Sequence, residues 1–192
     1  MNESRAIVNP MHLYQYFEHE RGPFLTLSDL SFEYATNMQN SLKENGNLLE
    51  KRDFDGNYLT FRRKVEADVR AAFIYKGGKP VRTAPQYFSL GENHIIAAEW
   101  FKCTDWVSIP IDEFDLETVS FTYGDSFIVN HPEHSNKADH RINVCTYAEI
   151  LAKIEENGWP QAFIKEDSPF WMPRYIEAQV WSDEPINKYR QQ

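Results

Sequence analysis

The sequence predicts an α+β fold in a single domain, with a helical N-terminal half and a mixed, mainly antiparallel curved sheet in the C-terminal half. Two long amphipathic helical patterns come early, whereas short strand-like runs separated by turns dominate after Pro85. Strand and helix patterns do not alternate regularly, which favours an α+β over an α/β architecture. The length of 192 residues fits one domain spanning 1–192, and we expect residues 1–10 to form a flexible tail.

Composition and charge argue against several classes of protein. Hydrophobic residues make up 42% of the chain and charged residues 26%, which is typical of a folded domain. The net charge of −9 opposes binding to duplex nucleic acid, which depends on basic side chains. The apolar runs are too short to span a membrane, and the N-terminus lacks the pattern of a signal peptide. We therefore expect an acidic cytoplasmic protein in which Cys103 and Cys145 stay reduced.

The N-terminal half contains one expected strand and two expected helices. A strand-like run covers 13–17, and a helix over 32–44 follows a serine that is a good N-cap. A second helix over 58–75 has an apolar face at helical spacing. We expect the charged residues of this second helix, Arg62 and Glu66 among them, to point into solvent.

The C-terminal half carries the remaining strands. Four strand-like runs are bounded by glycine, proline or polar turns: 86–90, 106–109, 119–123 and 175–181. A short helix is expected at 92–102. Thr146 and Glu149 form a capping box that begins a helix ending at Gly158. Residues 124–143 are expected to form a long polar loop.

The polar loop contains three histidines, His131, His134 and His140, beside acidic residues. Histidine and carboxylate are zinc ligands, but no helix or strand is expected there to hold them around one metal ion. We interpret the segment as a solvated loop and predict no metal site. The sequence patterns of serine hydrolases, dinucleotide-binding loops and phosphate-binding loops do not occur in the chain.

Two strand segments carry more polar side chains than core packing needs. The segment YGDS at 123–126 ends one strand, and alternation in 175–181 places Glu177 and Gln179 on one face between two aromatics. One interpretation is a strand-terminating turn and an ordinary polar sheet face. The other is a cleft in which these side chains orient a polar ligand.

Four segments together resemble a family of uncharacterised bacterial proteins. They are KGGKP at 76–80, PQY at 85–87, the stretch 120–126 and the stretch 174–185. The resemblance runs from about Leu13 to Tyr189 and implies kinship without an assigned activity.

The order of elements is also similar to the ADP-ribosyltransferase fold, in which a split sheet binds NAD in an open cleft. In that superfamily a first strand offers His or Arg to the ribose, a second strand offers Tyr or Ser, and a late strand offers the catalytic Glu. The resemblance implies, in this order, His12 or Gln15, then Tyr87 and Ser89, then Glu177 or Gln179.

The chain departs from this superfamily at two positions. Gln15 stands where the first strand commonly carries His, and Glu177-Ala178-Gln179 ends in an amide where the usual motif ends in Glu. In an active member the carboxylate would stabilise the oxocarbenium ion formed as nicotinamide leaves. With Gln179 in the catalytic position, the site would bind a nucleotide without turning it over.

We therefore hypothesise a polar and aromatic cleft for a small molecule or nucleotide, with NAD as the candidate ligand. The expected catalytic residues are Glu177 and Tyr87. The expected ligand-binding residues are Tyr14, Gln15, Ser89, Tyr123, Asp125 and Gln179. The alternative is a non-enzymatic interaction module with exposed aromatic anchors, namely Phe163, Phe170, Trp171 and Trp181. The sequence leaves the substrate, the oligomeric state and the presence of catalysis open.

Overall fold

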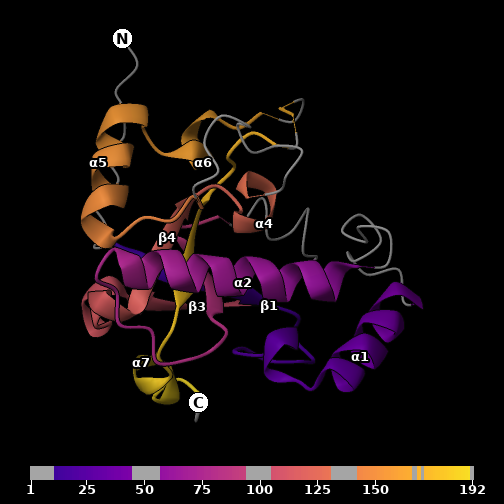
Figure 1. Ribbon diagram of the computed structural model, residues 1–192. Coiled ribbons are helices and arrows are strands. Elements are labelled where there is room, and N and C mark those ends of the chain that lie inside the picture. The colour runs from indigo at the N-terminus through magenta and orange to yellow at the C-terminus, as the bar shows by residue number, and fades with distance from the viewer. Residues whose placement is uncertain are drawn as a thin grey trace.

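The computed structural model describes residues 11–44, 57–93, 105–130, 142–165, 168–169 and 171–190. Within them the chain forms an α+β structure on one five-stranded sheet, with the strand order β3-β1-β2-β5-β4 (Figure 1). The strands are β1 (His12–Phe17), β2 (Gln86–Leu90), β3 (Asp105–Pro110), β4 (Val119–Tyr123) and β5 (Ile176–Val180). Each pair of neighbouring strands is antiparallel. The expected fold class is confirmed, and β1 joins the sheet from the N-terminal end between β3 and β2.

The three helices expected from periodicity and capping within these residues are present. They are α1 (Phe32–Glu44), α2 (Tyr58–Tyr75) and α5 (Tyr147–Asn157). The Thr146 hydroxyl accepts a hydrogen bond from the Glu149 amide, and the Glu149 carboxylate accepts one from the Thr146 amide. The predicted capping box is therefore confirmed.

Several short helices were not expected from the sequence. They are α4 (Ser126–Val129), α6 (Pro160–Phe163), α7 (Glu184–Asn187) and the 3₁₀ turns η1 (Leu27–Asp29), η3 (Ile111–Glu113) and η4 (Leu116–Thr118). Because α4 begins at Ser126, shortly after the end of β4, residues 126–129 of the polar segment 124–143 form a helical turn and not a loop. Most of the helix expected at 92–102 lies outside the described residues, as do 131–141 with the three histidines.

One face of the sheet forms the main hydrophobic core. All five strands contribute side chains to it, namely Leu13, Phe88, Leu90, Ile109, Val119, Phe121, Ile176, Ala178 and Val180. Ile150 of α5 and Ile186 of α7 are fully buried against this face. The period of two in the strands thus selects which side chains enter the core.

The opposite face of the sheet is polar and is covered by α2, which lies across it in Figure 1. Val65, Val69 and Phe73 of α2 pack with Phe127 and Trp181 in a second, smaller core cluster. The polar side chains of β2 and β5 therefore lie between a helix and the sheet, where an unpaired polar group is costly.

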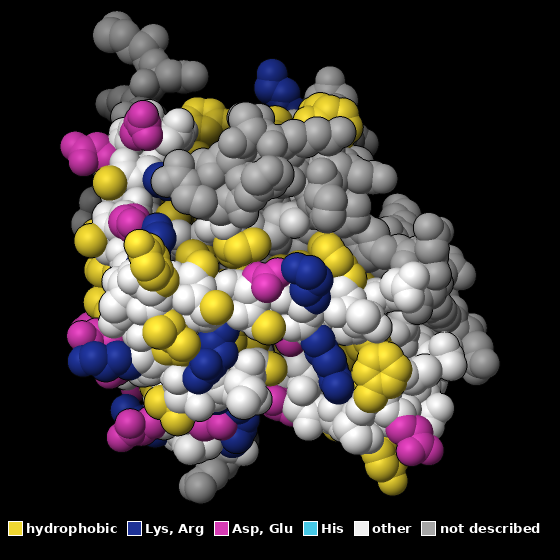
Figure 2. Space-filling model, in the orientation of Figure 1, with side chains coloured by type: hydrophobic (Ala, Val, Ile, Leu, Met, Phe, Trp, Pro, Cys, Tyr) yellow, Lys and Arg dark blue, Asp and Glu magenta, His cyan; other side chains and the backbone are white. Residues whose placement is uncertain are grey.

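Acidic and basic side chains are interspersed on the face of the molecule that α2 occupies (Figure 2). Isolated apolar side chains lie among them, as is normal for a protein surface. No helix among the described residues has the length and apolar character needed to cross a membrane.

Candidate functional site

The strand register brings several predicted site residues together on the polar face of the sheet. Tyr14 of β1 lies opposite Ser89 of β2, and Ser89 lies opposite Glu177 of β5. Tyr87 lies opposite Gln179. These residues come from three neighbouring strands. They share one face because residues paired across two strands lie on the same side of the sheet, as do residues two positions apart along one strand.

Tyr14, Tyr87, Ser89 and Glu177 line one cavity of about 130 Å³, which we call the Glu177 cavity. The described residues that line it are Tyr14, Tyr16, Tyr87, Phe88, Ser89, Asn93, Tyr175 and Glu177. The ring planes of Tyr14 and Tyr16 are inclined by 15° with centroids 6.3 Å apart. An aromatic lining with few polar groups is typical of sites for small ligands.

Glu177 is the carboxyl group of this cavity and is 3% exposed. Its Oε1 accepts hydrogen bonds from Gln179 Nε2 at 2.8 Å and from the Ser126 amide at 3.3 Å. Its Oε2 lies 3.4 Å from the Tyr175 hydroxyl. One carboxyl oxygen is therefore held by two donors, while the other meets a single hydroxyl at longer range.

Burial, and to a lesser extent the nearby charge of Asp125, together raise the pKa of Glu177 to about 7. The hydrogen bonds from Ser126 and Gln179 act against this shift. A carboxyl group whose pKa lies near neutrality can both give and take a proton, as general acid–base residues do.

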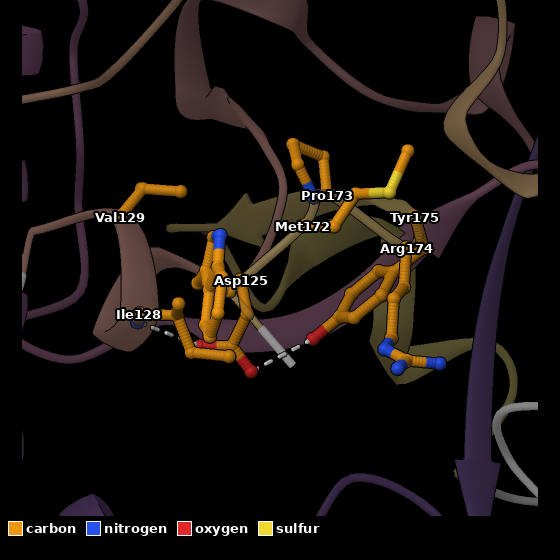
Figure 3. A pocket seen from close by; sticks show the side chains of 8 residues that line it. Asp125, Ile128, Val129, Met172, Pro173, Arg174 and Tyr175 are labelled. Atoms are coloured by element: carbon orange, nitrogen blue, oxygen red, sulfur yellow. Dashed lines mark hydrogen bonds between the residues drawn. The ribbon is translucent and has the colours of Figure 1, made fainter. Parts of the chain in front are cut away.

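Asp125 lies beside the cavity rather than in its lining. Its Oδ1 accepts hydrogen bonds from the amides of Phe127 at 2.9 Å and Ile128 at 3.4 Å, so it is the N-cap of α4. Its Oδ2 lies 3.2 Å from the Tyr175 hydroxyl, which points toward it in Figure 3. The Tyr175 hydroxyl thus lies between two carboxyl groups, 3.2 Å from Asp125 Oδ2 and 3.4 Å from Glu177 Oε2.

The pocket drawn in Figure 3 has a volume of about 10 Å³, the scale of a single water molecule. Asp125, Tyr175 and Arg174 line it, and the Tyr175 ring lies between Asp125 and the Arg174 guanidinium in Figure 3. A guanidinium N–H of Arg174 donates to the Ser168 carbonyl at 2.7 Å. This pocket is too small for an organic ligand, so the Glu177 cavity is the better candidate site.

Gln179 is buried next to Glu177 and does not line the cavity. The Trp181 indole donates to Ser120 Oγ at 2.9 Å, and the Ser120 hydroxyl donates to Gln179 Oε1 at 2.7 Å. Because an indole N–H can only donate, this series of hydrogen bonds places the amide oxygen of Gln179 toward Ser120. The amide nitrogen of Gln179 is therefore directed toward Thr122 and Glu177. The two candidates for the catalytic position are Glu177 and Gln179, and of these Glu177 lines the cavity.

Tyr87 is fixed by two residues of α2 that sequence reasoning placed in solvent. The Tyr87 hydroxyl donates to Glu66 Oε1 at 3.0 Å, and Arg62 Nε lies 3.0 Å from the same oxygen. The Arg62 guanidinium carbon lies 5.0 Å from the Tyr87 ring centroid. Burial and the charge of Glu66 raise the pKa of Tyr87 well above its ordinary value, so the hydroxyl remains a neutral donor.

The expectation that Arg62 and Glu66 point into solvent is therefore wrong. Their side chains are 11% and 3% exposed because the polar face of the sheet supplies a hydroxyl partner under α2. Glu66 precedes Val69 by three positions and Phe73 by seven, so its position on the apolar side of the helix was a usable signal. Tyr16, Asn93 and Tyr175 were also missed, and the alternation that selected Glu177 also selects Tyr175.

Gln15 and Tyr123 do not belong to the cavity. Both lie on the opposite face of the sheet from Tyr14 and Glu177, because they occupy the other phase of the strand alternation. Gln15 Oε1 accepts a hydrogen bond from the Phe24 amide at 2.6 Å, and the Tyr123 hydroxyl donates to the Gly158 carbonyl at 2.9 Å. His12 shares the face of Tyr14, and their ring centroids are 6.2 Å apart.

The aromatic anchors of the alternative hypothesis are divided between core and surface. Trp181 is fully buried, so the expectation that it is exposed is wrong: its indole N–H needs a partner and finds it in Ser120. Phe163 is 55% exposed and Trp171 is 57% exposed. Phe170 lies outside the described residues.

Comparisons of this chain with models of protein families, with curated proteins and with solved structures find no match.

Proposed function

We propose that this protein binds a small organic ligand with polar substituents in the Glu177 cavity. The observation that carries the proposal is a buried carboxyl group with a pKa of about 7, placed in a cavity whose other lining residues are mostly tyrosines. Structural networks also shift pKa values, but a shifted carboxyl in a cavity is a common mark of a functional site.

The first candidate ligand is the nicotinamide end of NAD, which the similarity to ADP-ribosyltransferases suggests. The cavity volume of about 130 Å³ is close to that of engineered cavities of about 150 Å³ that hold benzene. A single carboxamide-bearing ring fits this volume, whereas the rest of a dinucleotide would lie outside the cavity. Glu177 would exchange a proton or a hydrogen bond with the ligand, and Ser89 and Tyr14 would flank it.

Ligand-observed proton NMR with nicotinamide and with NAD tests this proposal. We expect line broadening of the ring protons with the wild-type protein and its loss in Ser89→Leu, which fills the cavity. The matched control is Ser108→Leu, because Ser108 lies opposite Tyr14 on the same sheet face but does not line the cavity. Absence of broadening at millimolar ligand would exclude NAD and nicotinamide.

The same experiment separates binding from catalysis. Free nicotinamide that appears from NAD over hours, and that Glu177→Gln abolishes, would establish an NAD-consuming enzyme. Broadening without release would establish a nucleotide-binding protein. Binding is favoured over the interaction module, because the burial of Trp181 removes one of that module's expected anchors.

A further inference from the structure

The side chains that line the Glu177 cavity indicate the charge of the group that it holds. Five of the eight lining residues are aromatic, and four of these five are tyrosines. Among these lining residues, Glu177 is the one that carries a charge when ionised. The cavity lining is therefore mainly aromatic and contains one acid.

Two further carboxyl groups lie behind the cavity lining, and the charge of Asp125 acts on Glu177. Glu66 lies behind Tyr87 and Asp125 lies behind Tyr175, and each accepts a hydrogen bond from the tyrosine hydroxyl in front of it. Arg62 of α2 is paired with Glu66 and lies 5.0 Å from the Tyr87 ring centroid, so this ion pair adds no net charge. A guanidinium N–H of Arg174 donates to the Ser168 carbonyl at 2.7 Å.

Tyrosine faces attract cations, and the attraction grows when the cation is desolvated. A protonated amine would need several hydrogen-bond acceptors in place of water, whereas a quaternary nitrogen has no N–H to satisfy. Ser89 Oγ already donates to the Gly91 carbonyl at 3.0 Å, which commits the proton of that hydroxyl. The lining thus suits a compact cation with an apolar surface.

We propose that the group seated in the Glu177 cavity is a compact organic cation of the quaternary ammonium or pyridinium class, enclosed by tyrosine rings and paired with the Glu177 carboxylate. The inference rests on the proposed function, since it requires the cavity to be a ligand site. It goes beyond that function because it fixes the charge of the ligand and the reason for its selection.

Two pairs of matched ligands test this inference. Choline is compared with 3,3-dimethylbutan-1-ol, in which carbon replaces the nitrogen, and 1-methylnicotinamide is compared with 3-methylbenzamide. Binding is measured by isothermal titration and ligand-observed NMR at pH 8, above the pKa of about 7, so that the Glu177 carboxyl is ionised. We expect at least one cation to bind about tenfold or more tightly than its neutral partner.

Variants assign the preference to named groups. Glu177→Gln keeps the shape of the side chain and should remove most of the preference, whereas Glu113→Gln on the surface turn η3 should retain it. Tyr14→Leu should weaken the cation more than the neutral partner, and Tyr14→Phe, which keeps the ring, should not. Circular dichroism melting of each variant confirms folding, and Tyr14→Leu with Tyr14→Phe suffices if Glu177→Gln does not fold.

The outcomes distinguish the two proposals. Neutral partners that bind as tightly as the cations, or a preference that persists in Glu177→Gln, would overturn the cation inference and leave the ligand site standing. If none of these ligands, nicotinamide or NAD binds, the proposed function itself fails and the inference fails with it. A preference confined to choline assigns an ammonium ligand, and one confined to 1-methylnicotinamide assigns a pyridinium.

Discussion

Gln179 Nε2 donates a 2.8 Å hydrogen bond to Glu177 Oε1, which lies two positions earlier on the same strand. The orientation of this amide is fixed from its far end by Ser120, which in turn accepts from the Trp181 indole. Glu177 therefore has a donor on one oxygen that cannot turn away, and Gln179 is a positioning residue for it. An amide at position 179 is what this arrangement requires.

Gln179→Glu should destabilise the protein, because it places a second carboxyl where the Gln179 nitrogen now donates to Glu177. Two carboxylates at that distance cannot both ionise, so the free energy of unfolding should fall by about 2 to 4 kcal/mol at pH 8 and by less at pH 5. Urea unfolding at the two pH values measures the change. The control is Asn37→Asp, an exposed amide-to-acid change on α1 that should have little effect at either pH. Equal losses for the two variants would contradict the proposed role of the amide.

The stability of the protein should fall as the pH rises from about 4.5 to above 7, because the pKa of Glu177 is raised from 4.5 to about 7 in the folded state. In this window the folded state binds more protons than the unfolded state, so the free energy of unfolding decreases with pH by up to about 3 kcal/mol from this group. Glu177→Gln should remove this component and be more stable than the wild type at pH 8.

Glu113→Gln is the control of opposite sign for this pH series. Hydrogen bonds from Tyr189 and Lys188 lower the pKa of Glu113, so its contribution is present above its ordinary pKa and is lost as the pH falls. Chemical denaturation from pH 4 to pH 9 compares the three proteins. A wild-type curve and a Glu177→Gln curve that run parallel would show that Glu177 titrates normally.

Asp125→Asn should lower the pKa of Glu177, because it removes the charge that helps to raise it. Asparagine is also a good N-cap, so α4 should keep its first turn. Carbon-detected NMR of the labelled Glu177 carboxyl measures the titration. Asp115→Asn is the matched control, since Asp115 caps the 3₁₀ turn η4 through the Glu117 amide. A Glu177 pKa that is the same in both variants would disprove the coupling to Asp125.

Glu66→Ala should be strongly destabilising, because it leaves the Arg62 guanidinium buried without its carboxylate and removes the acceptor of the Tyr87 hydroxyl. Loss of one partner of a buried ion pair costs about 3 to 5 kcal/mol. Asp68→Ala removes the exposed partner of Lys64 at the same spacing on the same helix, and it should cost about 0.5 kcal/mol or less. Denaturant unfolding of the two variants makes the comparison, and similar losses would mean that the buried pair contributes no more than a surface pair.

The local structure of this protein was largely determined by its sequence. The bounds of α1, α2, β2 and β4 follow from helical periodicity, strand alternation and turn residues that act within a few positions of the chain. The capping box of α5 is likewise a contact between residues three positions apart. Such signals can be read from neighbours in sequence. Alternation also identified Glu177 and Gln179 as residues of one face before their partners were known.

Which polar side chains meet depends on the tertiary structure. Gln15 and Tyr123 appeared equivalent to Tyr14 and Glu177 as polar strand residues, but the sheet register places them on the other face. The buried polar groups of Arg62 and Glu66 are satisfied by hydroxyls of other elements, those of Ser28 and Tyr87. The sequence determined the phase of each strand and helix, because that depends on local spacing. The choice of site residues depended on strand pairing and on the packing of α2 across the sheet, which join positions far apart in the chain.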